Sequence, residues 1–248
     1  MRLADLARFD RRRVRDEAAS LVVEGVRSVE SAVEAGARLR ALFVTDEALA
    51  TPRVAALADS ARVRPVVVGA KELARVSETE TSQGVVAVAA MPPEPPLASL
   101  RRVVVLDGVQ DPGNVGTLVR TAAWFGLDAV VCGPGTADVF APKVVRSAMG
   151  GLWDVGLVRI RDLGATLDAL RDQGLRVVGA DLGGEDARAW HPEGPTALVL
   201  GSEAHGLAPD THARLDARVT LPGRPRRQGA ESLNVAVAGG VLMWAMAR

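Results

Sequence analysis

The chain has 248 residues, 48% of them hydrophobic and 24% charged, which suffices for one large domain or two smaller ones with a substantial core. Thirty basic and thirty acidic side chains give a formal net charge of zero, which argues against a protein whose whole surface is basic for binding nucleic acid. A single cysteine excludes an intramolecular disulfide and a multi-cysteine zinc site, and no apolar run reaches the length of a membrane span. The charged beginning, "MRLADLARFDRRRVRDE", is not that of a secretory signal, so we expect a cytoplasmic protein without a membrane or metal partner.

Residues 1–91 alternate short apolar runs with helical periods. Strands are predicted over 21–25, 39–45, 64–69 and 84–90, and helices over 26–37, 46–60 and 70–78. The alternation predicts a small α/β domain. No catalytic cluster stands out in it, so a structural role and a substrate-binding role both remain open.

Four prolines in "MPPEPPLAS" predict a stiff linker over 92–99, followed by a second domain over 100–248. Its predicted strands cover 102–108, 128–133, 154–160, 175–181, 196–201 and 217–223, and its helices cover 115–125, 142–149, 163–173 and 233–246. Near-continuous apolar strands between helices predict a mostly parallel sheet covered on both faces. Ligands of such sheets bind in the loops beyond the carboxyl ends of the strands.

The first of these loops, "DGVQDPGNVG", matches neither of the common phosphate-binding patterns. Asn114 and Asn234 are the two asparagines of the chain, and each stands where a helix is predicted to begin. Asn114 is therefore either a helix cap or a site residue. Arg120 lies off the apolar stripe of the same helix, as a surface arginine or a functional one would.

The loop "GSEAHGL" places Ser202 and Glu203 directly after a strand. The nucleophile elbow of hydrolases needs Gly two residues before and after the Ser, and Leu200 and Ala204 stand there, which excludes that chemistry. Glu203 is then either an ordinary loop carboxylate or a site residue. His205 is one of three histidines, and an isolated histidine more often has a structural role.

The loop "PGRPRRQGAESLN" leads into a final helix with no charge before Arg248. Ser232 is predicted to cap that helix. Because a helix that is apolar all round must be buried, and Gly239 and Gly240 allow close approach, we expect it to pack inside the domain and against a second subunit.

Together these loops resemble the three motifs of the SpoU (TrmH-like) family of RNA 2′-O-ribose methyltransferases, in the SPOUT class. The motifs correspond to "DPGNVGTLVRTAAWFG", "LVLGSEAHGL" and "LP…ESLNVAVAGGVL", and "FAPKVVRSAMG" resembles a further family segment. Residues 1–91, with "LVVEGVRSVESAVEAG", are similar to the L30e-like RNA substrate-binding domain of many members. Two departures are Ser202, where many relatives carry Asn, and a longer, Arg-rich loop over 223–230.

The resemblance implies a mostly parallel α/β sheet with a deep trefoil knot, a homodimer formed through the C-terminal helix, and S-adenosylmethionine as cofactor. It implies that the cofactor is held around Leu200, Gly201, Leu221, Ser232 and Leu233. It assigns catalysis to Arg120, with Asn114, Glu203, Ser232 and Asn234 as positioning groups. The expected substrate is RNA, with ribosomal RNA favoured over transfer RNA.

Arginine-rich stretches are the expected RNA contacts, because guanidinium groups suit phosphate oxygens. They lie in the N-terminal helix and in the loop before the last helix: Arg11, Arg12, Arg13, Arg224, Arg226 and Arg227. Two rival functions differ in class. An RNA-binding protein without catalysis would lack the intact motif residues, and a nucleotide-dependent oxidoreductase would need a dinucleotide fingerprint, which the sequence does not contain.

Overall fold

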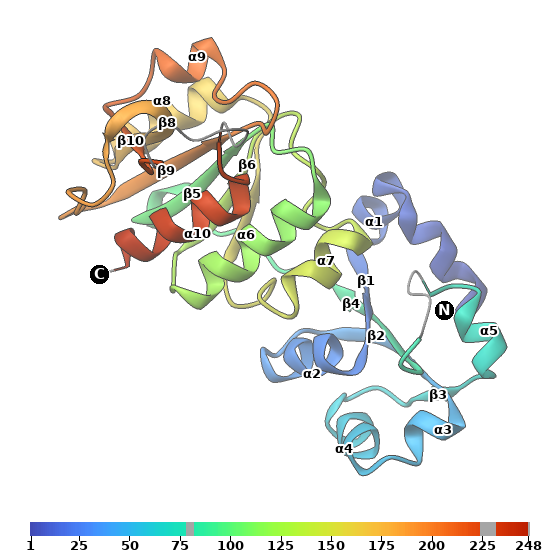
Figure 1. Ribbon diagram of the computed structural model, residues 1–248. Coiled ribbons are helices and arrows are strands. Elements are labelled where there is room, and N and C mark those ends of the chain that lie inside the picture. Colours follow the sequence, from blue (N-terminus) through green and yellow to red (C-terminus); the bar gives the residue numbers. More distant parts are fainter. Residues whose placement is uncertain (78–81, 224–231, 248) are drawn as a thin grey trace. The chain divides into compact units, whose positions relative to one another are not determined.

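The structure is a computed structural model that describes residues 1–77, 82–223 and 232–247. The chain divides into two compact units (Figure 1). The first unit comprises Met1–Pro92 and Asp138–Asp154, and the second comprises Pro93–Ala137 and Val155–Arg248. A short segment from the second half of the sequence therefore belongs to the first unit, whereas the predicted division assigned it to the domain over 100–248.

The first unit contains a four-stranded mixed sheet of order β1-β4-β2-β3. Its strands are β1 (Ser20–Glu24), β2 (Leu39–Val44), β3 (Val66–Val67) and β4 (Val85–Ala90). The central β4 is antiparallel to both neighbours, and β2 and β3 are parallel. Nearly every residue of β4 is buried, which explains its unbroken apolar sequence.

Helices cover the first sheet. They are η1 (Leu3–Asp10), α1 (Arg12–Ala18), α2 (Val26–Glu34), α3 (Asp46–Leu49), α4 (Pro52–Ser60), α5 (Ala70–Ala74) and α7 (Pro142–Ala148). Leu6 and Phe9 of η1 pack with Phe43, Val86 and Val88 of the strands. The predicted helix over 46–60 is in fact two helices, because Thr51 caps α4 and proline at its first position breaks the continuity.

The segment Asp138–Asp154 is held to the rest of the first unit by packing of α7 on β1 and by contacts near both of its ends. The Arg15 side chain, 2% exposed, donates a hydrogen bond from Nη2 to the Asp138 carboxylate and another from Nη1 to the Phe9 carbonyl. Gly150 has φ of 93°, and a Cβ there would lie 2.4 Å from the Ser31 Cβ on α2. The segment thus fits the first unit closely at both of its ends.

The second unit contains a six-stranded sheet of order β10-β8-β9-β5-β6-β7, in which every pair is parallel. Its strands are β5 (Arg102–Asp107), β6 (Ala129–Cys132), β7 (Gly156–Arg159), β8 (Arg176–Asp186), β9 (Thr196–Gly201) and β10 (Ala217–Thr220). The predicted parallel sheet is confirmed. The strand β8 runs five residues beyond its predicted end, because a polar, Gly-rich extension pairs with β10.

Longer helices lie on both faces of this sheet. The second unit also contains the short helices η2 (Leu97–Ser99) and α9 (Pro209–His212). On one face, α8 (Leu163–Asp172) packs on alternate strand residues that include Val103 and Val105. On the other, α6 (Pro112–Trp124) and α10 (Val235–Met246) lie side by side (Figure 1). No helix among the described residues is long and apolar enough to cross a membrane.

The helix α10 is apolar all round, as predicted, but within one chain only part of it is covered. Ala236, Gly239, Leu242, Met243, Ala245 and Met246 are buried. The Gly239 position is crowded, because a Cβ there would lie 2.5 Å from Leu118 Cδ2 and 2.7 Å from Leu200 Cδ1. Val237, Val241 and Trp244 form an exposed apolar stripe.

Candidate functional site

The central strands β5 and β9 end side by side at the carboxyl edge of the parallel sheet. Asp107, the last residue of β5, is paired with Gly201, the last residue of β9. The loops that follow these strands are tied together, since the amide of Ala208 donates to Asp107 Oδ2 at 2.8 Å. This edge is where ligands of open parallel sheets bind.

The loop after β5 leads directly into α6. Asp111 is the N-cap, and its Oδ1 accepts from the Asn114 amide at 2.8 Å, with Pro112 at the first helical position. Asn114 is thus the capped residue and not the cap. The prediction that this helix begins at 115 is three residues late. The helix begins at Pro112, because proline is well suited to the first position of a helix.

The loop after β9 turns back sharply. Ser202 and Gly206 form an isolated antiparallel bridge, and a Cβ on Gly201 would lie 2.2 Å from the backbone carbon of Gly206. Because backbone atoms cannot yield as a side-chain tip can, this position requires glycine. The turn leaves Glu203 projecting toward the start of α6.

Glu203 holds the two loops together. Its Oε2 accepts from the Gln110 amide at 3.1 Å, and its Oε1 accepts from the Asp111 amide at 3.3 Å and from Asn114 Nδ2 at 2.9 Å. Partial burial raises the pKa of Glu203, but the hydrogen bonds from Asn114 and from the backbone amides lower that pKa by more, so it lies below the ordinary glutamate value. Glu203 is therefore ionised at neutral pH and acts as a fixed acceptor.

The two asparagines of the chain are hydrogen-bonded to each other. Asn234 Nδ2 donates to Asn114 Oδ1 at 3.0 Å, and Asn234 Oδ1 accepts from the amides of Ala236 and Val237 at 2.9 and 3.2 Å. Asn234 is therefore the N-cap of α10, and the prediction that Ser232 caps this helix is wrong. The orientations of the Asn114 and Asn234 side-chain amides follow from their neighbours. The Glu203 carboxylate only accepts, so it faces Asn114 Nδ2, and the backbone N–H groups of α10 only donate, so they face Asn234 Oδ1.

The remaining predicted site residues lie on α6, at the ends of β9 and β10, and before α10. Arg120 is exposed on α6, six residues after Asn114, which is about 9 Å along a helix axis. Leu200 is buried at the end of β9, and Leu221 follows β10 directly. Ser232 and Leu233 are exposed just before α10.

The predicted RNA-binding arginines fall in two places. Arg11, Arg12 and Arg13 are exposed at the start of α1 in the first unit, where Arg12 pairs with Asp16 and Arg13 with Glu17. Arg224, Arg226 and Arg227 lie outside the described residues.

Two residues that organise the site were missed by the sequence reading. Asp107 anchors the loop after β9, and Asp111 caps α6. The signal for Asp111 was present in the sequence, since Asp followed by Pro is a frequent start of a helix. Across the described ranges, no group of three or more His, Cys, Asp and Glu side chains could hold a metal ion.

The fold and this arrangement define a class: an α/β protein whose ligand-binding edge is built by three loops from separate parts of the sequence. Comparison with known proteins narrows the class. The SpoU rRNA Methylase family matches residues 101–244, and the MRM3-like substrate binding domain matches residues 2–87. The chain belongs to the SpoU family and is an RNA methyltransferase, which confirms the resemblance seen in its motifs.

Relatives cover almost the whole chain. The 23S rRNA (guanosine(2553)-2′-O)-methyltransferase RlmP of Bacillus subtilis is 34% identical over 98% of this chain and 94% of its own length. A TrmH-family RNA methyltransferase structure from Porphyromonas gingivalis has 34% identity and a TM-score of 0.84 over 98% of this chain and 95% of its own. The AviRb methyltransferase of Streptomyces viridochromogenes, in complex with the cofactor AdoMet, has 28% identity and a TM-score of 0.88 over 99% and 96%.

Proposed function

We propose that this enzyme transfers the methyl group of S-adenosylmethionine to the ribose 2′-hydroxyl of one nucleotide in ribosomal RNA. The observation that carries the proposal is the hydrogen-bonded series Glu203–Asn114–Asn234, which joins the three motif loops at one edge of the sheet. The relative RlmP, which is named for 23S rRNA, favours that RNA as the substrate.

S-adenosylmethionine is the methyl donor, as in the AviRb complex. Leu200, Gly201, Leu221, Ser232 and Leu233 are the residues that would hold it, at the ends of β9 and β10 and before α10. They fit such a ligand because the crowded turn at Gly201 leaves backbone groups, and no side chain, at the end of β9. When bound, the cofactor supplies a methyl group that its sulfonium already activates.

The enzyme must then place the 2′-hydroxyl in line with that methyl group and stabilise the oxygen as its proton leaves. We assign the second task to Arg120. Its guanidinium stays protonated, so it acts by stabilising the developing alkoxide and not as a general base, while an RNA phosphate is a candidate proton acceptor. Asn114, Asn234 and Ser232 position the reactants, and Glu203 positions Asn114.

We assign RNA recognition to residues 1–91 and catalysis to residues 100–248, joined by the linker over 92–99. The arginines of α1 and of the loop over 224–227 contact phosphates, so affinity should fall steeply with added salt. The match of residues 2–87 to a substrate-binding domain supports this division.

We further propose a homodimer formed through α10. The exposed stripe of Val237, Val241 and Trp244 supports it, because one chain leaves this apolar surface uncovered. We also propose a cytoplasmic location, which is consistent with ribosomal RNA as the substrate.

The test is Arg120→Ala, assayed by transfer of a labelled methyl group to an unmethylated 23S rRNA transcript. The rate should fall by at least about 10²–10³-fold, as when a donor to an oxyanion is removed, with affinity for S-adenosylmethionine unchanged. Arg176→Ala is the matched control, because Arg176 is exposed at the opposite, amino-terminal edge of the sheet. Substantial turnover by Arg120→Ala would refute this role, and methylation of a tRNA transcript in place of rRNA would refute the substrate.

A further inference from the structure

An open cavity of about 200 Å³ lies entirely within the first unit. Six of the residues that line it are Gly25, Arg27, Ser28, Gln83, Arg146 and Met149. They come from the start of α2, the approach to β4 and the end of α7, so the cavity exists only because the segment Asp138–Asp154 packs on this unit.

Two guanidinium groups face this cavity from different parts of the chain. Arg27 is exposed in the first turn of α2, and Arg146 is half-buried in the last turn of α7. Two arginines converging on one space favour an anionic ligand, and their planar donor sets suit phosphate oxygens.

Ser28 adds a hydroxyl to the cavity wall, and the residue is 7% exposed. A serine hydroxyl can donate to or accept from an oxygen of a ligand. The start of α2 has no side-chain cap at Gly25, and the Val26 amide instead donates to Gln83 Oε1 at 2.9 Å.

Met149 supplies an apolar side of the cavity. It is 41% exposed and has φ of 45°, a conformation that is uncommon outside glycine. The close contact of Gly150 with Ser31 holds the turn in place. A flexible, polarisable thioether at a rim is suited to contact with a planar ring.

The cavity also presents a carboxylate, which a bare phosphate would avoid. Glu24 lines it and accepts a hydrogen bond from Ser77 Oγ. A carboxylate can accept from the N–H groups on a base edge. Cationic, apolar and anionic groups around one space fit a nucleotide, with its phosphate and its base, better than either part alone.

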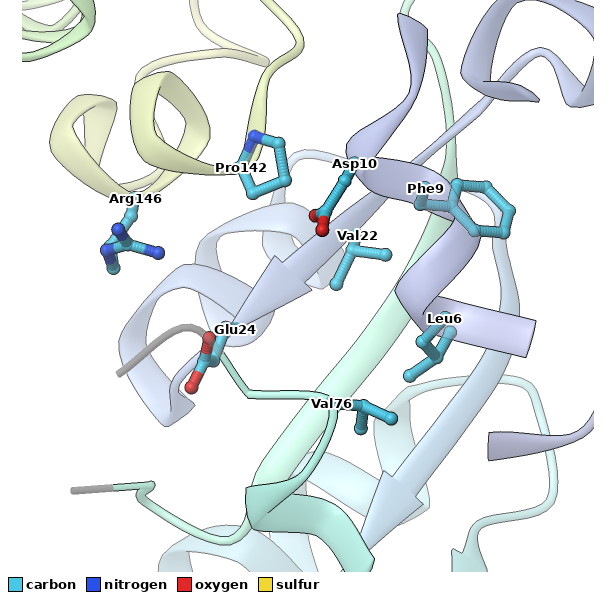
Figure 2. A pocket seen from close by; sticks show the side chains of 8 residues that line it. All are labelled: Leu6, Phe9, Asp10, Val22, Glu24, Val76, Pro142 and Arg146. Carbon is cyan, nitrogen blue, oxygen red and sulfur yellow. The ribbon is translucent and has the colours of Figure 1, made fainter. Parts of the chain in front are cut away.

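The size of the cavity limits the ligand. Pockets for drug-sized ligands measure about 300–1,000 Å³, so this smaller, open space holds no more than one nucleotide. Glu24 and Arg146 also border a neighbouring pocket of about 20 Å³ between η1, β1 and α7 (Figure 2). That second space is sufficient for about one water molecule, so it does not enlarge the binding site.

We propose that this cavity binds one unpaired nucleotide of the RNA substrate, with its phosphate between Arg27 and Arg146 and its base against Met149. The proposal rests on the proposed function and deepens it, because it names the part of the RNA that the first unit reads. A base paired within a duplex is covered on both faces and does not reach such a cavity, so the site selects single-stranded RNA.

The test measures binding of two fluorescein-labelled RNA probes to the full-length protein by anisotropy: a single-stranded 12-mer and a duplex of the same sequence. Arg27→Ala and Arg146→Ala should each weaken binding of the single strand by about tenfold or more. Each should also make the slope of log K against log[salt] shallower by about 0.7, as expected for the loss of one phosphate contact. Binding of the duplex should change little. Arg64→Ala is the matched control, because Arg64 is exposed in the same unit and does not line the cavity.

Thermal unfolding and S-adenosylmethionine affinity, measured on the same variants, verify that each is folded. With an rRNA transcript, the two cavity variants should raise KM and leave kcat at saturation unchanged. Arg27→Ala binding as tightly as Arg64→Ala would overturn the proposal, and so would equal losses on the single strand and the duplex. If the wild-type chain bound no S-adenosylmethionine or methylated no RNA, the proposed function would fail instead, which these measurements distinguish.

Discussion

In the second unit, the polar side chains at the ends of β5 and β9 are bonded to one another, whereas those that line the cavity of the first unit come from separate parts of the chain and surround an open space. In each of Glu203, Asn114 and Asn234, both terminal heavy atoms of the side chain form hydrogen bonds with other groups of the chain. Around the cavity, Arg27 and Arg146 border an open space. A prearranged set of groups suits a reaction, which requires fixed geometry, and charged groups around an open space suit capture of a ligand.

The first unit also contains a buried pair of charged side chains. Arg15 is buried and paired with Asp138, and this pair joins the N-terminal helices to the segment that supplies Arg146 and Met149. The comparison predicts that changes to fixed pairs act on stability or rate, and that changes to the cavity act on RNA affinity.

The largest effect is expected for Asp138→Ala. This change leaves the Arg15 guanidinium buried without its carboxylate, which costs about 3–5 kcal/mol in comparable buried pairs. The free energy of unfolding, from urea denaturation, should fall by about that amount. Asp154→Ala, at an exposed position of the same segment, should change it by less than about 0.5 kcal/mol. Similar losses in both variants would show that the buried pair does not hold the segment.

Asn114→Ala should act on the second unit alone. It removes the group that joins Glu203 to Asn234, so the loops of the first and third motifs lose their shared hydrogen bonds. A misplacement of about 1 Å can cost about 10²-fold in rate, and we expect a loss of that order in single-turnover methyl transfer. Binding of the single-stranded RNA probe should be unchanged. Thr117→Ala, exposed one turn later on α6, should retain the wild-type rate.

The sequence was sufficient to predict the elements of the second unit because apolar runs report burial directly. The predicted strand over 196–201 coincides with β9, and the order of strands and helices predicted a parallel sheet. The extension of β8 to Asp186 had no such signal, because "DLGGED" is polar and pairs through its backbone.

Positions that depend on distant partners were harder to predict. Apolar residues of α7, such as Val144 and Val145, show that one face is buried but not against which unit. Helix caps are similar: Asn114 and Ser232 are both suitable cap residues, and Asp111 and Asn234 take the role because of where the helices begin. The pairing of the two asparagines follows from the fold and has no sequence signature of its own.

Gly239→Ala should have a smaller effect, confined to the second unit. Its Cβ would meet the tips of Leu118 and Leu200, and overpacking of this kind costs about 1–3 kcal/mol, partly offset by the helix propensity of alanine. Gly240→Ala is the control, because its Cβ would lie 3.7 Å from Thr121 Cγ2, an ordinary contact. Since Leu200 is the next-to-last residue of β9, affinity for S-adenosylmethionine should fall in Gly239→Ala while the RNA probe binds normally. If the free energy of unfolding of Gly239→Ala were higher than that of wild type, Leu118 and Leu200 would have to repack around the added methyl group without cost.

The smallest expected effect is the pH dependence of Glu203→Gln. The folded-state pKa of Glu203 is lowered, so its ionised form stabilises the fold at pH values above the unfolded-state pKa of about 4.3, and that contribution disappears as the pH falls through the folded-state pKa. Wild type should therefore unfold at a higher temperature than Glu203→Gln at neutral pH, and the two should converge in acid. Because the side chain is exposed, solvent screening keeps the difference small. Glu193→Gln, exposed in the same unit, should follow wild type at every pH. A difference between wild type and Glu203→Gln that widened in acid would contradict the role of Glu203 as an ionised acceptor between the two loops.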